Sequence, residues 1–300
     1  MFSLSSWLHL RIHFSYFLLP VYLFSVAISP NLNTDRLLWV FLIVHLFLYP
    51  ASNAYNSYFD KDEKSIGGLK HPPPIKKGLY YLAILFDLAA IIFGYLKVNL
   101  LFAVMVLIFG LISKAYSHPS VRLKKLPITG WIVTGLFQGF FTVLMCYTGL
   151  NDFAFESMLK PHILTPALLT SIMLFANYPM TQIYQHDEDL RRGDITLSSK
   201  LGIRGTFYFS GLLFTLAAVG FVYFFSTYYQ IKYGWHFLVA LSPVILFFLF
   251  WFNRVFKDES KADYSHTMWL NIVSATCLNI FFIWFFLDSS QVLQALLRGF

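Results

Sequence analysis

The sequence predicts an all-α membrane protein, a single domain over residues 1–300 that forms a bundle of nine transmembrane helices with an internal repeat. Three observations predict this class. First, the chain is 57% hydrophobic and only 12% charged, whereas soluble domains are roughly 25% charged. Second, nine apolar stretches approach the length of about 20 residues that a membrane-spanning helix needs. Third, one polar motif occurs twice, at the ends of two of these stretches. Such a chain has too few charges to cover a soluble surface, which excludes a cytosolic enzyme, a disordered chain and a disulfide scaffold.

The predicted spans follow one another with short connections, which leave no room for a soluble domain. They cover residues 13–30, 37–57, 79–97, 99–116, 128–150, 163–184, 206–229, 235–253 and 268–288. The first stretch lacks a basic start and contains Pro20, with Arg11 and His13 at its head. These features favour a first helix over a cleaved signal peptide.

The basic residues are distributed unequally between the two sides of the membrane. With nine spans, the loops after the even-numbered spans share a side with the N-terminus, and 17 of the 22 lysines and arginines lie on that side. The positive-inside rule therefore places the N-terminus and these loops in the cytoplasm and the C-terminus outside. We expect a multi-pass protein of a bacterial inner (plasma) membrane. Because this asymmetry accounts for the net charge of +7, we expect the lipid bilayer and no nucleic acid as a partner.

The internal repeat relates the end of span 2 to the end of span 6. Residues 49–60 read YPASNAYNSYFD and residues 178–189 read YPMTQIYQHDED, at an offset of 129. The identical pairs are Tyr49 and Tyr178, Pro50 and Pro179, Tyr55 and Tyr184, and Asp60 and Asp189. Three further positions carry similar polar side chains, so seven of the twelve positions agree. This similarity predicts that spans 2 and 6 are equivalent.

Each repeat carries a polar stripe. Positions 49, 53, 56 and 60 are spaced to share one helix face, and positions 178, 182, 185 and 189 have the same spacing. Each stripe presents a tyrosine, two carboxamides and an aspartate. Because carboxamides are costly in lipid, both stripes are predicted to face the bundle interior. Hydrogen bonding between helices is the alternative interpretation, but it does not explain the acids that follow.

Acidic residues cluster directly after both stripes. Seven of the fifteen carboxylates lie there: Asp60, Asp62, Glu63, Asp187, Glu188, Asp189 and Asp194. Carboxylate and carboxamide oxygens suit Mg²⁺, which binds through one or two carboxylates plus substrate phosphates. The interleaved lysines and arginines suit the phosphate oxygens. A solvated, salt-bridged loop is the alternative for one cluster, but two clusters on matching helices favour a metal–diphosphate site.

The chain resembles the UbiA family of intramembrane prenyltransferases, which have nine helices and two Asp-rich motifs after helices 2 and 6. Asn56 and Asp60 match the first motif, N-D-x-x-D-x-x-x-D, in which Ser57 and Lys64 replace acids. The second motif is matched by Asp189, Gly193, Thr196–Leu197 and Leu201–Gly202, with Gln185 in place of its first Asp. Residues 116–119 (YSHP) and 122–124 (RLK) resemble the family's basic loop after span 4. The resemblance covers the first seven spans.

This resemblance implies transfer of an isoprenyl group from an allylic prenyl diphosphate to an aromatic, quinone-type or other lipophilic acceptor, with Mg²⁺ as cofactor. The implied metal ligands are Asn56, Asp60, Asp62, Glu63, Gln185, Asp187 and Asp189. The implied diphosphate-binding residues are Lys114, Arg122, Lys124, Arg191 and Lys200. Asp60 and Asp189 are also implied to be catalytic, as are Tyr55 and Tyr184, whose rings, with that of Tyr178, would face a carbocation.

Other functions are compatible with parts of the pattern. A membrane terpene cyclase of the same family would use the same ionisation and end it by internal capture. A polytopic transporter would explain the repeat, but its site would lie near the membrane midplane. A CDP-alcohol phosphotransferase would resemble a D-G-x-x-A-R pattern, which the chain lacks. Asp87, within span 3, is either a proton acceptor or the partner of a polar neighbour.

Overall fold

The computed structural model describes residues 3–151 and 155–291, and the regular secondary structure in that part is helical apart from one isolated bridge between Ile66 and Leu69. Nine helices in the described part are long and apolar enough to cross a membrane. The single-segment spans are α5 (Gly78–Lys97), α6 (Leu100–Ser117), α9 (Pro161–Met180), α11 (Leu197–Tyr228), α12 (Ile231–Lys257) and α13 (Tyr264–Ser289). The composite spans are the first, with α1 (Leu4–His9), η1 (Ile12–Leu18) and α2 (Leu19–Ala27); the second, with α3 (Thr34–Leu42), η2 (Ile43–Leu48) and α4 (Tyr49–Asp60); and the fifth, with α7 (Pro127–Gly135), η4 (Leu136–Phe141) and α8 (Thr142–Asn151). The predicted all-α class with nine spans is thus confirmed.

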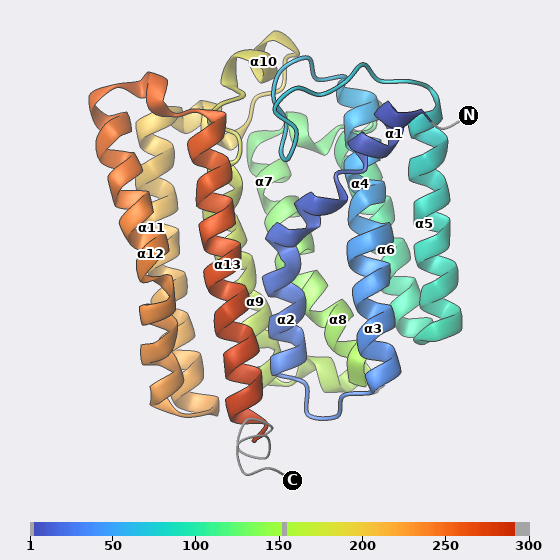
Figure 1. Ribbon diagram of the computed structural model, residues 1–300, viewed down its shortest axis with the longest axis vertical. Helices are drawn as coiled ribbons and strands as arrows, with labels where there is room; N and C mark the ends of the chain where they lie inside the picture. Colours follow the sequence, from blue (N-terminus) through green and yellow to red (C-terminus); the bar gives the residue numbers. More distant parts are fainter. Residues whose placement is uncertain (1–2, 152–154, 292–300) are drawn as a thin grey trace.

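The spans run alternately up and down, so that α1, the even-numbered loops and the short helix α10 (His186–Arg191) gather at one end of the bundle (Figure 1). The other short helices are η3 (Leu123–Lys125), η5 (Phe155–Leu159) and η6 (Glu259–Lys261). The gathered end carries both acidic clusters and the basic loop after α6. The two acidic clusters and the basic loop therefore meet at one end of the bundle.

The first span differs from the predicted helix over 13–30. The chain begins its helix at Leu4, breaks at Arg11, which has a left-handed backbone (φ 47°), and continues as a 3-10 helix until α2. Pro20 lies in the first turn of α2, where its missing N–H costs no intrahelical hydrogen bond. The break turns the Arg11 side chain into the bundle, where only 6% of the residue is exposed.

Two composite spans contain a π-helical segment. In the second span, η2 directly precedes α4, whose first turn contains Pro50, a residue without an N–H for the regular pattern. In the fifth span, η4 brings Gly139 against α9. A Cβ added to Gly139 would lie 2.6 Å from Ser171 Cα, so the two backbones are in close contact.

Gly139→Ala is therefore expected to destabilise the protein by about 1–3 kcal/mol, because the added methyl group must push two helices apart. The midpoint of thermal unfolding in detergent, followed by tryptophan fluorescence, measures this effect. Gly205→Ala is the matched control, since a Cβ there meets only its own helix neighbour Leu201 at 3.4 Å. Equal midpoints for the two variants would contradict the close contact.

The second polar stripe does not lie on one continuous helix, as the spacing predicted. The first stripe does, because α4 runs from Tyr49 to Asp60. Helix α9 instead ends at Met180, directly after Pro179, and residues 181–184 form a turn before α10. The equivalence of spans 2 and 6 stays a prediction from the sequence.

The seventh span starts nine residues earlier than the predicted 206–229, at Leu197. Thr196 caps this start by accepting a hydrogen bond from Ser199 N at 3.1 Å. Gly202 then interrupts the helix with a positive φ of 69°, a conformation that glycine adopts without strain. The hydropathy pattern misses residues 197–205 because Ser198, Ser199, Lys200 and Arg204 interrupt the apolar residues there.

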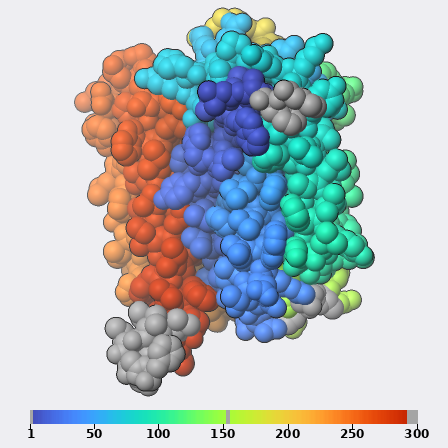
Figure 2. Space-filling view, turned by 45° about the vertical axis from the view of Figure 1, so that its right-hand side comes forward, coloured from blue at the N-terminus to red at the C-terminus, as the bar shows by residue number. Residues whose placement is uncertain are grey.

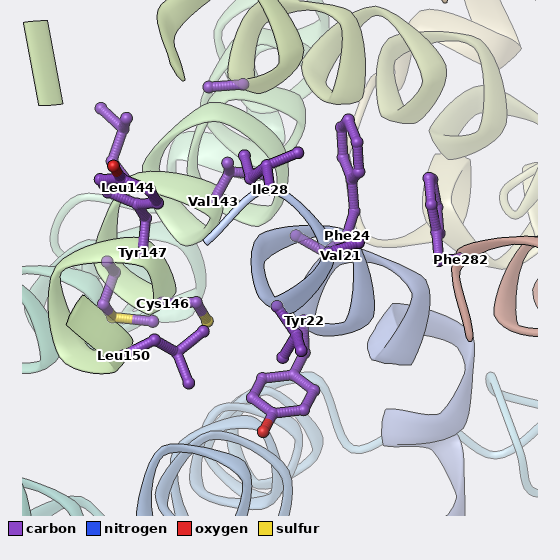
Figure 3. Packing of buried hydrophobic residues seen from close by; sticks show 14 of the residues in the cluster. Val21, Tyr22, Phe24, Ile28, Val143, Leu144, Cys146, Tyr147, Leu150 and Phe282 are labelled. Atoms are coloured by element: carbon purple, nitrogen blue, oxygen red, sulfur yellow. The ribbon is translucent and has the colours of Figure 1, made fainter. Parts of the chain in front are cut away.

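The interior of the bundle is packed with aromatic and aliphatic side chains. Figure 3 shows α2 and α8 residues of the largest cluster, in which Phe24 stacks on Phe282 with ring centroids 4.5 Å apart. Cys146 is fully buried there as a free thiol. This packing holds α2, α8 and α13 together below the polar end.

Candidate active site

A cavity of about 290 Å³ opens among the spans at the end that carries the acidic clusters. Both polar stripes face it. Its polar wall includes Tyr49, Asn53, Asn56, Asp60, Asp62, Lys124, Tyr178, Gln182, Gln185, Asp189 and Asp194. Its apolar wall includes Phe17, Leu18, Phe109, Ile112, Val133, Phe137 and Leu174. The cavity is thus charged at the loop end and apolar deeper in the bundle.

Asp60 lies at the centre of the charged wall. Its Oδ2 accepts a hydrogen bond from Asn56 Nδ2 at 2.7 Å and forms an ion pair with Lys124 Nζ at 2.6 Å. Asn56 Nδ2 also donates to Ser117 Oγ at 3.0 Å, which fixes the carboxamide. The other carboxylate oxygen of Asp60, Oδ1, is buried without a hydrogen-bond partner. Asp60 therefore keeps one oxygen for a further ligand.

The basic loop after α6 is held beside Asp60 by Asp194. Arg122 Nε and Nη2 donate to the two oxygens of Asp194 at 2.8 and 2.7 Å, and Lys124 Nζ lies 3.5 Å from Asp194 Oδ2. Arg122 Nη1 is also 3.7 Å from Asp60 Oδ1. Burial alone would raise the pKa of Asp194, but its hydrogen bonds and charge pairing with Arg122 and Lys124 hold that pKa below its ordinary value. Arg122 and Lys124 thus stand beside the acids of both motifs.

Asp189 enters the cavity from α10. Its side chain makes no hydrogen bond or ion pair with the residues that the structure describes, and it is half-buried. Burial raises the pKa of the Asp189 carboxyl to about 7, against the opposing effect of Lys124. The neighbouring acids Asp194, Asp62 and Asp60 add to this rise. A bound cation at this position would relieve the repulsion.

A single arginine joins the two acidic loops. Arg192 forms ion pairs with Asp62 and, at 2.6 Å, with Glu188. Glu188 Oε1 also accepts the backbone N–H of Glu63 at 3.0 Å. Gln185 Nε2 donates to Ser65 O at 3.2 Å. Loop 61–77 is therefore fixed to α10 over the charged wall.

The N-terminal segment fixes the other side of this loop. Arg11 lines the cavity and donates to Gly67 O at 3.0 Å and Asn53 O at 3.1 Å, while its Nε is buried without a partner. His9 and His13 contact the carbonyl oxygens of Pro73 and Gly68 at 2.8 and 2.9 Å. Figure 2 shows this segment lying against the loop at the end of the bundle. Loop 61–77 is thus held from two sides.

Two tyrosines line the wall between the charged and apolar parts. The hydroxyls of Tyr116 and Tyr178 are hydrogen-bonded to each other. Both rings border the cavity. Their rings thus lie in the same cavity as the acids, and the carbocation role that the resemblance implies for Tyr178 stays a prediction.

The structure places several of the other predicted site residues away from the cavity. Tyr55 packs in a buried cluster with Leu79 and Leu82, and Tyr184 packs against Tyr264 with ring centroids 5.3 Å apart. Glu63, Asp187, Arg191 and Lys200 are exposed and do not line the cavity. Lys114 pairs with Asp87 between α5 and α6. Of the predicted metal and diphosphate residues, those that line the cavity are Asn56, Asp60, Asp62, Lys124, Gln185 and Asp189.

The Asp87–Lys114 pair is expected to stabilise the bundle without contributing to ligand binding. Lys114→Met leaves Asp87 without its charge partner in a site where it is 6% exposed and should cost about 2 kcal/mol. The double variant Asp87→Asn/Lys114→Met should recover most of this loss and keep wild-type affinity for a prenyl diphosphate. Thermal unfolding measures the change in stability, and binding of a radiolabelled prenyl diphosphate measures the affinity. Weaker binding by the double variant would show that Lys114 contributes to diphosphate binding.

The donor set fits Mg²⁺. A buried Asp60 oxygen without a hydrogen-bond partner and the accessible Asp189 carboxylate face the same cavity. The described residues contain no group of three or more His, Cys, Asp or Glu that could hold a metal ion by themselves. Two carboxylates complemented by phosphate oxygens are a usual environment for Mg²⁺.

A second cavity, about 870 Å³ and mostly apolar, adjoins the first between α2, α9, α11, α12 and α13. Phe17, Leu174, Asn177 and Asn271 line both cavities. Asn177 Nδ2 donates to Asn271 Oδ1 at 3.2 Å at this boundary. The polar site therefore connects to a volume suited to a lipophilic molecule.

Sequence reasoning missed three contributors to the site. Arg11, Tyr116 and the asparagine pair at the cavity boundary were not among the predicted site residues. Arg11 had a signal, because an ionisable residue at the head of an apolar span is a functional candidate by default. Asn271 had none, since it comes from the ninth span, where no motif is present.

Fold and cavity together define a helical membrane protein with a cationic and acidic site that opens onto an apolar interior. The model of the UbiA prenyltransferase family matches residues 17–286, and the chain belongs to this family. No curated protein matches the chain.

Solved structures share the fold at low sequence identity. A UbiA homologue from Archaeoglobus fulgidus, bound to GPP and Mg²⁺, is 16% identical with a TM-score of 0.66, covering 94% of this chain and 99% of that one. The apo structure of a UbiA homologue from Aeropyrum pernix K1 is 16% identical with a TM-score of 0.70, covering 91% and 98%. A structure of digeranylgeranylglyceryl phosphate synthase is 18% identical with a TM-score of 0.60, covering 95% and 99%.

Proposed function

We propose that the chain transfers an isoprenyl group from an allylic prenyl diphosphate to a lipophilic acceptor, with Mg²⁺-dependent ionisation and release of diphosphate. One observation carries this proposal: Asp60 and Asp189, from segments 129 positions apart, face one cavity together with Lys124. The archaeal homologue that binds GPP and Mg²⁺ supports the choice of donor class. The acceptor is aromatic, quinone-type or another lipophilic molecule.

The charged wall has the chemistry to stabilise a departing diphosphate. Asp60 and Asp189 would hold Mg²⁺, with Asn56 orienting Asp60. The ion supplies charge stabilisation to the leaving group when bound. Lys124 and Arg122, which lie 2.6 and 3.7 Å from the oxygens of Asp60, would contact the same diphosphate. Arg11 adds a further buried cation to the cavity lining. Such fixed charges are often the largest catalytic contribution.

The apolar wall of the cavity, with the two tyrosines beside it, suits the carbocation that ionisation of the donor creates. Phe109, Phe137 and the Tyr116–Tyr178 pair offer π-faces and limit access of water, which would quench an allylic cation. The adjoining apolar cavity offers room for the lipophilic part of a substrate. We propose that the charged end faces the cytoplasm, where the basic loops are favoured.

Diphosphate release tests this function. Purified protein in nanodiscs is incubated with geranyl to longer prenyl diphosphates, with and without Mg²⁺ and an aromatic membrane extract. Release that needs Mg²⁺ and the extract supports the transferase. Release without an acceptor supports a cyclase of the same family. Absence of release together with absence of Mg²⁺-dependent donor binding would contradict both and favour a transporter.

A further inference from the structure

The cavity has fewer free carboxylates than its acid-rich sequence suggests. We infer that it binds a single divalent cation, and that it holds this cation only together with a diphosphate. This inference rests on the proposed function and specifies the metal centre of the same site. It follows from what each carboxylate contacts.

Two of the four cavity carboxylates accept hydrogen bonds from arginines. Asp194 accepts both hydrogen bonds of the Arg122 guanidinium, at 2.8 and 2.7 Å. Asp62 is paired with Arg192, which Glu188 holds at 2.6 Å. Such paired carboxylates have already exchanged water for a charged partner, and a metal ion would have to break buried ion pairs to use them.

The other two carboxylates offer few oxygens. Asp60 Oδ2 is shared by Asn56 and Lys124, at 2.7 and 2.6 Å, which leaves Oδ1 without a hydrogen-bond partner, 3.7 Å from Arg122 Nη1. Asp189 offers its carboxylate without competing hydrogen bonds in the described part of the chain. The protein therefore presents two acidic groups, one from each loop.

The three motif positions without an acid add no carboxylate to the site. Ser57 is fully buried and does not line the cavity. Lys64 is exposed and carries a positive charge. Gln185 lines the cavity and donates from Nε2 to the carbonyl of Ser65 at 3.2 Å, so its amide can offer a cation only the neutral oxygen Oε1. Among the described residues that line the cavity, a second cation would thus find no further free carboxylate.

Coordination geometry then couples the metal to the substrate. Mg²⁺ takes about six oxygen ligands in octahedral geometry, and sites with one or two carboxylates depend on substrate phosphates for the rest. Two carboxylates that also face Lys124 attract a lone divalent cation weakly, because the ammonium repels it. A diphosphate reverses this balance, since it supplies both oxygens and negative charge.

Manganese binding tests the inference without turnover. Free Mn²⁺ is measured by electron paramagnetic resonance in a titration of the purified chain in nanodiscs, with and without geranyl thiolodiphosphate, whose C–S bond resists ionisation. Binding of the labelled analogue is measured in parallel. We expect one Mn²⁺ per chain with the analogue, and at least about tenfold weaker binding without it.

A gain-of-ligand variant sharpens the test. Gln185→Asp places a third free carboxylate four residues before Asp189, and it should strengthen Mn²⁺ binding in the absence of the analogue. Gln230→Asp is the matched control, because Gln230 is exposed at the opposite end of the bundle, at the start of α12; it should leave Mn²⁺ binding unchanged.

The outcomes separate this inference from the proposed function. Two Mn²⁺ per chain with the analogue, or tight Mn²⁺ binding by the wild type alone, would overturn the single-ion inference and leave the prenyltransferase proposal intact. Failure of the analogue to bind at any Mn²⁺ concentration would overturn the proposed function itself, and the inference with it.

Discussion

Asp60→Asn and Asp189→Asn are each expected to lower the rate of diphosphate release by about 100- to 1000-fold, the loss that follows removal of one fixed electrostatic contact to a developing charge. The two substitutions act in the same way because each removes one of the two carboxylates that remain free to hold the cation. Asparagine keeps the size of the side chain, so the packing of α4 and α10 is preserved. Steady-state release of diphosphate, with the thermal midpoint as a check on folding, measures the effect.

Asp187→Asn is the matched control for this prediction. Asp187 lies on the same short helix as Asp189, two residues away, but it is exposed and does not line the cavity. We expect this variant to retain most of the wild-type rate. Full activity of both Asp60→Asn and Asp189→Asn would contradict the two-loop site. A loss for Asp187→Asn equal to that for Asp189→Asn would show that α10 presents a different face to the substrate.

The sequence predicts the membrane fold because hydropathy is a local property. A stretch of apolar residues must span the bilayer whatever its neighbours do, and all nine predicted spans correspond to spans of the structure. Their ends are less predictable. Polar residues form the helical start at Leu197, and a left-handed Arg11 interrupts the first span. Both deviations depend on contacts that the order of residues does not display.

Helical spacing predicts which polar residues line the cavity but not the backbone structure that carries them. All eight stripe positions line the cavity, although α9 ends at Met180 and only the first stripe is a continuous helix. Tyr55 and Tyr184 are conserved between the repeats but lie off the stripe face, and both pack elsewhere. The helical spacing already indicated that Tyr55 points away from the stripe, because position 55 does not share a face with positions 56 and 60.

The folded structure is needed to show which partner each lysine and arginine side chain contacts. Arginines and lysines are long, and their partners come from distant segments. Lys114 finds Asp87 on the neighbouring helix, whereas Arg11 reaches Gly67 and Asn53. Each pairing joins segments whose relative placement no periodicity in the chain determines. The sequence therefore identifies the chemistry of the site, whereas the packing of the helices determines which residues form it.

Arg122→Met is expected to destabilise the protein by about 3 kcal/mol, because it leaves the carboxylate of Asp194, which is 2% exposed, without its bidentate partner. The double variant Arg122→Met/Asp194→Asn removes both charges and should recover most of this loss. Arg204→Met is the matched control at the same end of the bundle. Arg204 and Glu259 form an ion pair at 3.1 Å in which both side chains are about half exposed, and such surface pairs contribute about 1 kcal/mol or less.

The contribution of this pair also depends on pH in a predictable direction. Because Arg122 and Lys124 hold the folded-state pKa of Asp194 below its ordinary value, the stabilisation is complete above the ordinary aspartate pKa of about 4. It is lost as the pH falls through the lower, folded-state value. The difference in thermal midpoint between wild type and Arg122→Met should therefore be constant at neutral pH and shrink in acid. A difference that grew in acid, or an Arg122→Met midpoint equal to that of Arg204→Met, would contradict the buried pair and require another partner to hold the basic loop beside Asp60.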